Sequence, residues 1–115
     1  MGTMKTLVII PTWNERENIS ILIPAIFKIL PDIDVLVVDD NSPDGTAEVV
    51  RNMQIDTKNL HLIVGHGKEG LGKAYIRGFL EVLKNMQFDQ IIMMDADFSH
   101  DPQYLPDMIH AAQYA

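Results

Sequence analysis

Two carboxylates separated by one residue, Asp95 and Asp97, follow an apolar run at 91–94. The run is typical of a buried strand, and in extended backbone residues i and i+2 project to the same side. Two such carboxylates repel each other unless they share a cation. Mg²⁺ typically takes one or two protein carboxylates and completes its shell with water and substrate phosphates, and Mn²⁺ accepts similar ligands. A solvated loop, with Asp101 capping a helix, is the alternative. The position after a buried strand, opposite a second acidic cluster, favours a metal site.

That second cluster is the segment DDNSPDGT at 39–46, which follows another apolar run. An acid in this position commonly accepts hydrogen bonds from a ribose or base in nucleotide-binding sheets. Because adjacent residues alternate faces, we expect only one of Asp39 and Asp40 to face a ligand. Turn chemistry explains the segment equally well, since its residue types form turns and Asp44 or Thr46 can start a helix.

Two further segments carry candidate side chains. In PTWNERE, at 11–17, Trp13 can stack on a base or sugar and Glu15 can hydrogen-bond a base edge. Packing of the tryptophan on the core, with acids favouring a helix N-terminus, is the alternative, and it is the simpler interpretation of Trp13 alone. The glycine-rich segment at 65–74 lacks the spacing of a phosphate-binding loop, so a turn is preferred, although Lys68 can lend charge to a diphosphate.

Alternating strands and helices must position these segments. Pro24 sits awkwardly in the first helical pattern and predicts either a late start capped by Ser20 or a kink. An N-cap at Asp101 begins the last helix. Strands are predicted at 6–10, ended by Pro11, and at 34–40, 60–65 and 90–95, and helices within 19–30, 44–53 and 71–86.

This order predicts an α/β fold: a doubly wound, mainly parallel, Rossmann-like sheet of strand order 3-2-1-4. The first strand then lies between the second and the fourth. Ligands bind outside the carboxyl ends of such strands, so the polar segments after strands 1, 2 and 4 should meet on one rim.

Composition bounds the function. The 115 residues suit one domain, and the formal net charge of −7 argues against nucleic-acid binding. The chain has no cysteine, which excludes disulfides and thiolate sites and suits a reducing compartment. No apolar run approaches the roughly 20 residues that cross a bilayer, and no signal peptide is evident, so we expect the cytoplasm or the cytoplasmic face of a membrane. Residues 1–3 have the character of a cloning remnant, and the domain is taken as 4–115.

Four motifs in register, VIIPTWNERENI, VVDDNSPDGT, KEGLGKAYIRGF and MDADFSHDP, cover nearly the whole chain. Together they resemble the dolichyl/polyprenyl-phosphate mannosyltransferases of the inverting GT-A glycosyltransferase family 2. The resemblance implies the nucleotide-binding half of a GT-A fold, a nucleotide-sugar donor such as GDP-mannose, and a polyprenyl phosphate acceptor. In the nucleoside region it implies that Pro11, Trp13 and Glu15 border the nucleoside, and that Val38 and Asp40 meet the base or ribose. Trp13 replaces the tyrosine more usual in relatives.

The same resemblance assigns the diphosphate region. Asp95, Ala96 and Asp97 would form the metal and diphosphate site, with Mg²⁺ or Mn²⁺ on Asp95 and Asp97 and the catalytic role on Asp97. Ser99 would lie beside the metal, where some relatives carry glutamine. Charge grows on the leaving diphosphate as the sugar bond breaks, and the cation would neutralise it.

Relatives continue beyond the position of Ala115, so the resemblance implies that these residues are the N-terminal, donor-binding part of a longer enzyme, inactive alone and in peripheral membrane contact when whole. A family 2 transferase using a UDP-sugar and a non-catalytic nucleotide-binding module are the alternatives. A receiver-like signalling domain ranks lower, because it needs paired acids after the first strand, where Pro11 stands.

Overall fold

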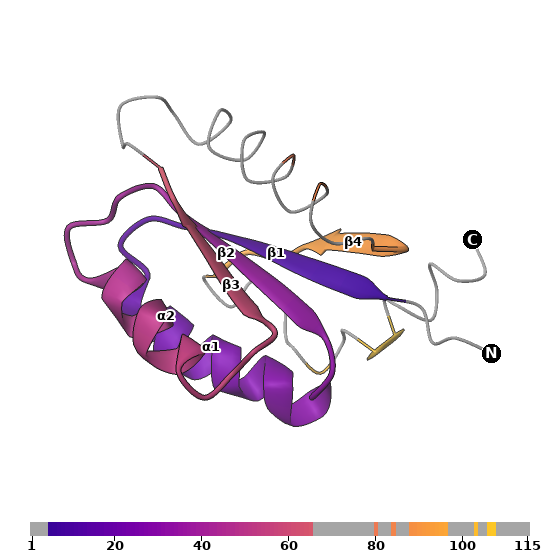
Figure 1. The fold of residues 1–115 in the computed structure, drawn as a ribbon. Coiled ribbons are helices and arrows are strands. Elements are labelled where there is room, and N and C mark those ends of the chain that lie inside the picture. Colours follow the sequence, from indigo (N-terminus) through magenta and orange to yellow (C-terminus); the bar gives the residue numbers. More distant parts are fainter. Residues whose placement is uncertain are drawn as a thin grey trace.

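The computed structural model describes residues 5–65, 80, 84, 88–96, 103 and 106–107. The described residues form a four-stranded sheet of order β3-β2-β1-β4, in which every pairing is parallel (Figure 1). Within them, no helix combines the length and the apolar character needed to cross a membrane. The elements are β1 Thr6–Thr12, α1 Arg16–Ile29, β2 Asp34–Asp39, α2 Thr46–Gln54, β3 Leu60–Val64 and β4 Gln90–Met93.

The predicted strand order is confirmed, and β1 lies between β2 and β4. The register places Ile9 beside Leu36 on one side and beside Met93 on the other. Because the three strands run in the same direction, the residues that follow them meet at one end of the sheet.

Apolar side chains are buried on both faces of the sheet, as expected for parallel strands that read as continuous hydrophobic runs. Helices α1 and α2 cover one face (Figure 1). Their side chains Ile19, Leu22 and Val50 pack there with Val8 and Val37. The other face buries a smaller cluster, made up of Leu7, Ile9, Leu36 and Val38.

Strand β1 does not end before Pro11, as the sequence predicts, but continues to Thr12. The Ile9 carbonyl accepts a hydrogen bond from Met94 N–H, so residue 9 faces β4. Residue 11 faces the same side, because main-chain groups alternate between the two neighbours along a strand. β4 has already ended at Met93, which pairs with Ile9, so the missing N–H of Pro11 costs no ladder hydrogen bond.

Helix α1 begins at Arg16, so the predicted late start capped by Ser20 is wrong. Instead, the Ser20 hydroxyl donates a 2.7 Å hydrogen bond to the Glu17 carbonyl within the helix. Pro24 lies inside α1 on its exposed face. The carbonyl four residues earlier loses its helical partner, but Ser20 is exposed and water can take that place. The kink at Pro24 stays a prediction.

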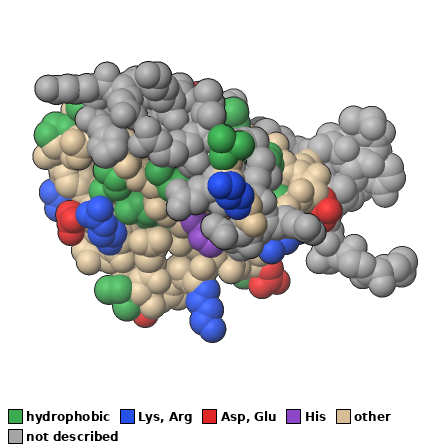
Figure 2. Space-filling model, turned by 45° about the horizontal axis from the view of Figure 1, so that its top comes forward, with side chains coloured by type: hydrophobic (Ala, Val, Ile, Leu, Met, Phe, Trp, Pro, Cys, Tyr) green, Lys and Arg blue, Asp and Glu red, His purple; other side chains and the backbone are tan. Residues whose placement is uncertain are grey.

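Several predicted features differ in extent or lie outside the described residues. Strand β2 ends at Asp39, β3 at Val64 and β4 at Met93, each slightly earlier than predicted, and α2 begins at Thr46. The third and last predicted helices lie largely outside the described residues. Figure 2 shows acidic and basic side chains interspersed on one face of the molecule. The distribution of charge on that face therefore does not locate a binding site, and the ends of the strands are used to locate it instead.

Candidate functional site

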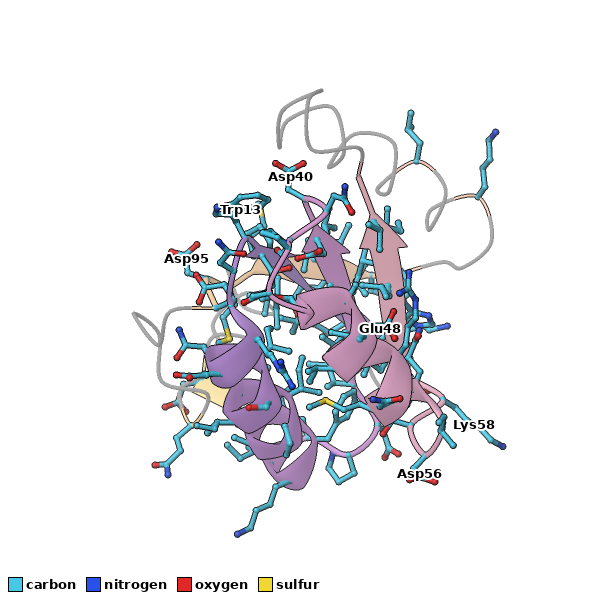
Figure 3. All side chains as sticks on the ribbon, turned by 90° about the vertical axis from the view of Figure 1, so that its left-hand side faces the viewer. Trp13, Asp40, Glu48, Asp56, Lys58 and Asp95 are labelled. Atoms are coloured by element: carbon cyan, nitrogen blue, oxygen red, sulfur yellow. The ribbon has the colours of Figure 1, made fainter. Side chains whose placement is uncertain are left out.

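Three of the predicted site residues lie at the same end of the sheet. Figure 3 shows Trp13, Asp40 and Asp95 along the end where the strands finish, with Asp56 and Lys58 at the opposite end. Each of the three follows a different strand, β1, β2 and β4 respectively. The strand order 3-2-1-4 therefore brings together side chains far apart in the sequence, as predicted.

The two adjacent acids after β2 have different environments. The Asp39 side chain is fully buried, whereas Asp40 is partly exposed. The Asp39 carboxylate accepts hydrogen bonds from the Thr12 hydroxyl at 2.7 Å and from the Ser42 N–H and hydroxyl at 2.8 and 2.6 Å. These bonds compensate the desolvation of a buried carboxylate. Asp39 thus stabilises the ends of β1 and β2 and the loop after β2, and Asp40 is the acid of the pair that is exposed to solvent.

Hydrogen bonds join the loop after β1 (13–15, the first loop) to the loop after β2 (40–45, the second loop) and to the first residue of α2. Asn14 N–H donates to the Ser42 hydroxyl at 2.9 Å, and Glu15 N–H donates to the Thr46 hydroxyl at 3.2 Å. Asp40 N–H in turn donates to the Thr12 carbonyl at 3.1 Å. Trp13 and Asp40 are therefore carried by loops whose backbones are fixed against each other.

Backbone conformation in the two loops is specialised. Asn14 has a φ of 53° and Asn41 a φ of 58°, in the left-handed region that asparagine tolerates better than most residues. Next to Asn14, residue Trp13 is 53% exposed. Packing on the core, the simpler interpretation of this tryptophan alone, is therefore wrong in this structure, and the ring is available for stacking.

Glu15 lies in an open polar hollow of about 380 Å³ at the start of α1. Its carboxylate accepts a 2.8 Å hydrogen bond from the Asn18 side-chain amide. This bond orients the carboxylate from within the same helix turn, while its partly exposed position leaves room for a further donor. The hollow is lined by residues 14–18 and by Asp44.

Asp44 has a role that sequence reasoning missed. One carboxylate oxygen accepts the N–H of Arg16, the first residue of α1, at 3.1 Å. The other accepts the N–H and the hydroxyl of Thr46, the first residue of α2. Partial burial works against the charged form, but the hydrogen bonds from Thr46 and from Arg16 N–H outweigh it and lower the pKa of Asp44. Turn chemistry indicated the contact with α2, but no local pattern reveals a contact 28 residues away.

Pro11 and Val38, both predicted to border the donor, are register partners in β1 and β2. The Val38 side chain is fully buried among the smaller apolar cluster. Ala96 is also buried, in the larger cluster with Met94. The apolar side chains of Val38 and Ala96 lie in the core and position Asp40 and Asp95, so any donor contact from these two residues would come from their main chain.

The predicted metal site is described only in part. Asp95 is exposed at the end of β4, on the rim with Asp40, whereas Asp97 and Ser99 lie outside the described residues. Among the residues that are described, no three His, Cys, Asp or Glu side chains cluster as a metal site. A hard divalent cation that also binds substrate phosphates needs only one or two carboxylates. The Asp95 carboxylate is suited to be one of these ligands.

Comparison with known proteins gives relatives along nearly the whole chain. The chain is 40% identical to the undecaprenyl-phosphate mannosyltransferase of Micrococcus luteus over 112 residues, 97% of this chain and 46% of that protein. It is also 40% identical to the polyprenol monophosphomannose synthase of Mycolicibacterium smegmatis over 110 residues, 95% of this chain and 41% of that protein. The chain thus spans less than half the length of these curated relatives.

Solved structures share the fold. A mannosyltransferase from Pyrobaculum calidifontis in complex with GDP-Man and Mn²⁺ superposes with a TM-score of 0.68 at 25% identity, over 84% of this chain and 28% of that one. A glucosyl-3-phosphoglycerate synthase from Mycobacterium tuberculosis in complex with UDP gives a TM-score of 0.70 at 20% identity, over 97% of this chain and 41% of that one, a likeness of fold alone. The family model for glycosyl transferase family 2 matches residues 7–114, and the chain belongs to that family.

Proposed function

We propose that this chain supplies the donor- and metal-binding part of an inverting, metal-dependent glycosyltransferase that transfers mannose from GDP-mannose to a polyprenyl phosphate. The observation that carries the proposal is the meeting of Trp13, Asp40 and Asp95 at the carboxyl end of a 3-2-1-4 sheet. The choice of mannose and of a polyprenyl phosphate rests on the names of the two relatives at 40% identity. GDP-Man in the Pyrobaculum mannosyltransferase supports the choice of donor nucleotide.

In this proposal the nucleoside lies against the first and second loops. The exposed Trp13 ring offers a stacking surface, and Asp40 accepts hydrogen bonds from the ribose or base. Glu15, oriented by Asn18, accepts hydrogen bonds from the edge of the base. Pro11 and Val38 support these residues from the ends of β1 and β2.

The diphosphate lies towards the end of β4. Asp95 and Asp97 would hold Mg²⁺ or Mn²⁺, with Ala96 between them and Ser99 beside the metal. Bound there, the cation would supply positive charge where negative charge develops on the leaving diphosphate. Mn²⁺ in the Pyrobaculum structure supports a divalent ion without deciding between the two metals.

The acceptor phosphate is already anionic at neutral pH, so it needs positioning rather than deprotonation. One of its oxygens forms the new bond to the anomeric carbon on the face opposite the diphosphate. The old carbon–oxygen bond breaks and its electron pair leaves with the nucleoside diphosphate, so the configuration inverts. We therefore expect that no side chain acts as a general base. This expectation would be contradicted if changing one carboxylate of the rim to an amide abolished transfer while the donor and the metal still bound. A lipid-linked acceptor also implies peripheral contact of the whole enzyme with a membrane.

A thermal-shift comparison of GDP, UDP, GDP-mannose and UDP-glucose, each with and without Mn²⁺, tests the proposal. A ligand that binds only the folded state raises the apparent melting temperature by mass action. We expect the guanosine ligands with Mn²⁺ to raise it most. A larger effect of UDP and UDP-glucose would favour a UDP-sugar transferase instead. Nucleotide binding without transfer by the full-length protein would favour a non-catalytic module.

A further inference from the structure

The hydrogen bonds of Asp44 connect the N-termini of α1 and α2, which follow the loops that carry Trp13 and Asp40. Its two carboxylate oxygens accept N–H groups from Arg16 and Thr46, the first residues of α1 and α2. The first N–H groups of a helix have no partner within the helix and need an acceptor from outside. Neither helix provides one at its own N-cap position, where Glu15 and Gly45 make no side-chain capping bond.

The same carboxylate fixes the geometry of both loops. Holding Arg16 N–H sets where the first loop, with Trp13, enters α1. Asp44 also accepts a hydrogen bond from the Thr46 hydroxyl, which sets the rotamer of Thr46. The same hydroxyl oxygen accepts the hydrogen bond from Glu15 N–H. Asp44 thus acts on the first loop twice, once directly and once through Thr46.

Charge also favours this arrangement. The positive ends of two helix dipoles point towards Asp44, and each stabilises a negative side chain. The Arg16 guanidinium lies beside the same segment and donates to the Asp44 carbonyl at 3.5 Å. The lowered pKa of the Asp44 carboxyl agrees with an ionised group at neutral pH.

We propose that Asp44 is a positioning residue for donor binding, which holds the loop of Trp13 and Glu15 against the loop of Asp40 without itself touching the nucleotide. The inference rests on the proposed function, because the donor is taken to bind between these loops. Loss of the link should leave each helix formed but let the first loop move relative to the second. Donor affinity should then fall because the loops must be ordered on binding.

Asp44→Ser separates the two contacts. A serine hydroxyl at position 44 can still accept Thr46 N–H in a local turn, but it is shorter and has no second oxygen for Arg16. Ile26→Val is the matched control, since it removes one methylene from the buried part of α1 far from the loops and costs a comparable amount of stability. Asp56→Asn, at the opposite end of the sheet, controls for the loss of an acidic charge.

Two measurements test the proposal. Trp13 is the only tryptophan of the 115 residues, so its fluorescence anisotropy and acrylamide quenching report on the first loop without any ligand. Of the three variants, we expect only Asp44→Ser to show lower anisotropy and stronger quenching of Trp13 than wild type. Its affinity for GDP in the presence of Mn²⁺ should be about fivefold weaker than that of wild type. Ile26→Val and Asp56→Asn should match wild type in both measurements.

The outcomes are distinguishable. If Asp44→Ser and Ile26→Val change Trp13 fluorescence and GDP affinity equally, Asp44 serves stability alone and the inference is overturned. The inference also fails if Asp44→Ser frees Trp13 but leaves GDP affinity unchanged. If wild type itself binds no nucleotide, the proposed function fails and the donor role of Asp44 fails with it, whatever Trp13 reports.

Discussion

The Thr12 hydroxyl donates a 2.7 Å hydrogen bond to the Asp39 carboxylate, and both side chains are buried. The two residues are the last of β1 and β2 and face each other in the parallel register. The residues that follow them are Trp13 and Asp40. This bond therefore joins the ends of β1 and β2 directly before the two side chains proposed to contact the nucleoside.

Replacement of Asp39 by alanine should be strongly destabilising. Three donors, the Thr12 hydroxyl and the two of Ser42, would lose their buried acceptor, and we expect a loss of about 3 kcal/mol in the free energy of unfolding. Thr12→Val removes one donor only and should cost about 1 kcal/mol. Urea denaturation measures both values. Equal losses in the two variants would mean that the desolvation of Asp39 offsets its hydrogen bonds.

Substitutions of Asn14 test the backbone strain in the first loop. At a φ of 53°, Asn14→Ala forces an ordinary L-residue into the left-handed region and should cost about 1 kcal/mol. Asn14→Gly removes that strain and should stay within about 0.5 kcal/mol of wild type, because the gain offsets the greater freedom of the unfolded chain. The melting temperatures of the two variants provide the comparison. An alanine variant as stable as the glycine variant would show that the loop adapts.

Asp44 should give the fold a pH dependence of defined sign. Its pKa is lowered from the ordinary 3.8 in the folded chain, so the ionised form contributes stability above that value, which is lost as the pH falls through the folded pKa. We expect Asp44→Asn to melt below wild type at neutral pH, and the difference in melting temperature to narrow as the pH falls below 3.8. Glu15, Glu17 and the Arg16 guanidinium line the same hollow, so the difference between the two proteins, not the wild-type curve, is informative. A gap independent of pH would contradict the assignment.

Asp40→Asn should weaken GDP binding without unfolding the protein. Loss of a charge-assisted hydrogen bond to the ligand should reduce the affinity about tenfold, while the partly exposed side chain contributes little to stability. Isothermal titration of GDP with Mn²⁺ measures the affinity, and Asp56→Asn at the far end of the sheet is the control. Equal affinities for the two variants would remove Asp40 from the site.

The sequence predicts the arrangement of the sheet well, because β-branched apolar runs alternate with amphipathic helices and only a few parallel topologies are common. It is less informative where an outcome depends on contacts between distant segments. The effect of Pro11 on β1 depends on which neighbouring strand its missing N–H would face. The start of α1 at Arg16 depends on an acceptor that Asp44 supplies from the second loop. Neither relationship has a local sequence signal.

We propose that a cation and a nucleoside diphosphate bind where β4, β1 and β2 end. Mn²⁺ broadens the amide NMR signals of nuclei near it, so titration of the ¹⁵N-labelled chain with Mn²⁺ in the presence of GDP maps the site directly. We predict that the signals of Trp13, Asp40 and Asp95 broaden first, that those of Asp56 and Lys58 stay sharp, and that Asp95→Asn weakens the effect. Broadening centred on Asp56 and Lys58, or spread evenly over the chain, would contradict the account.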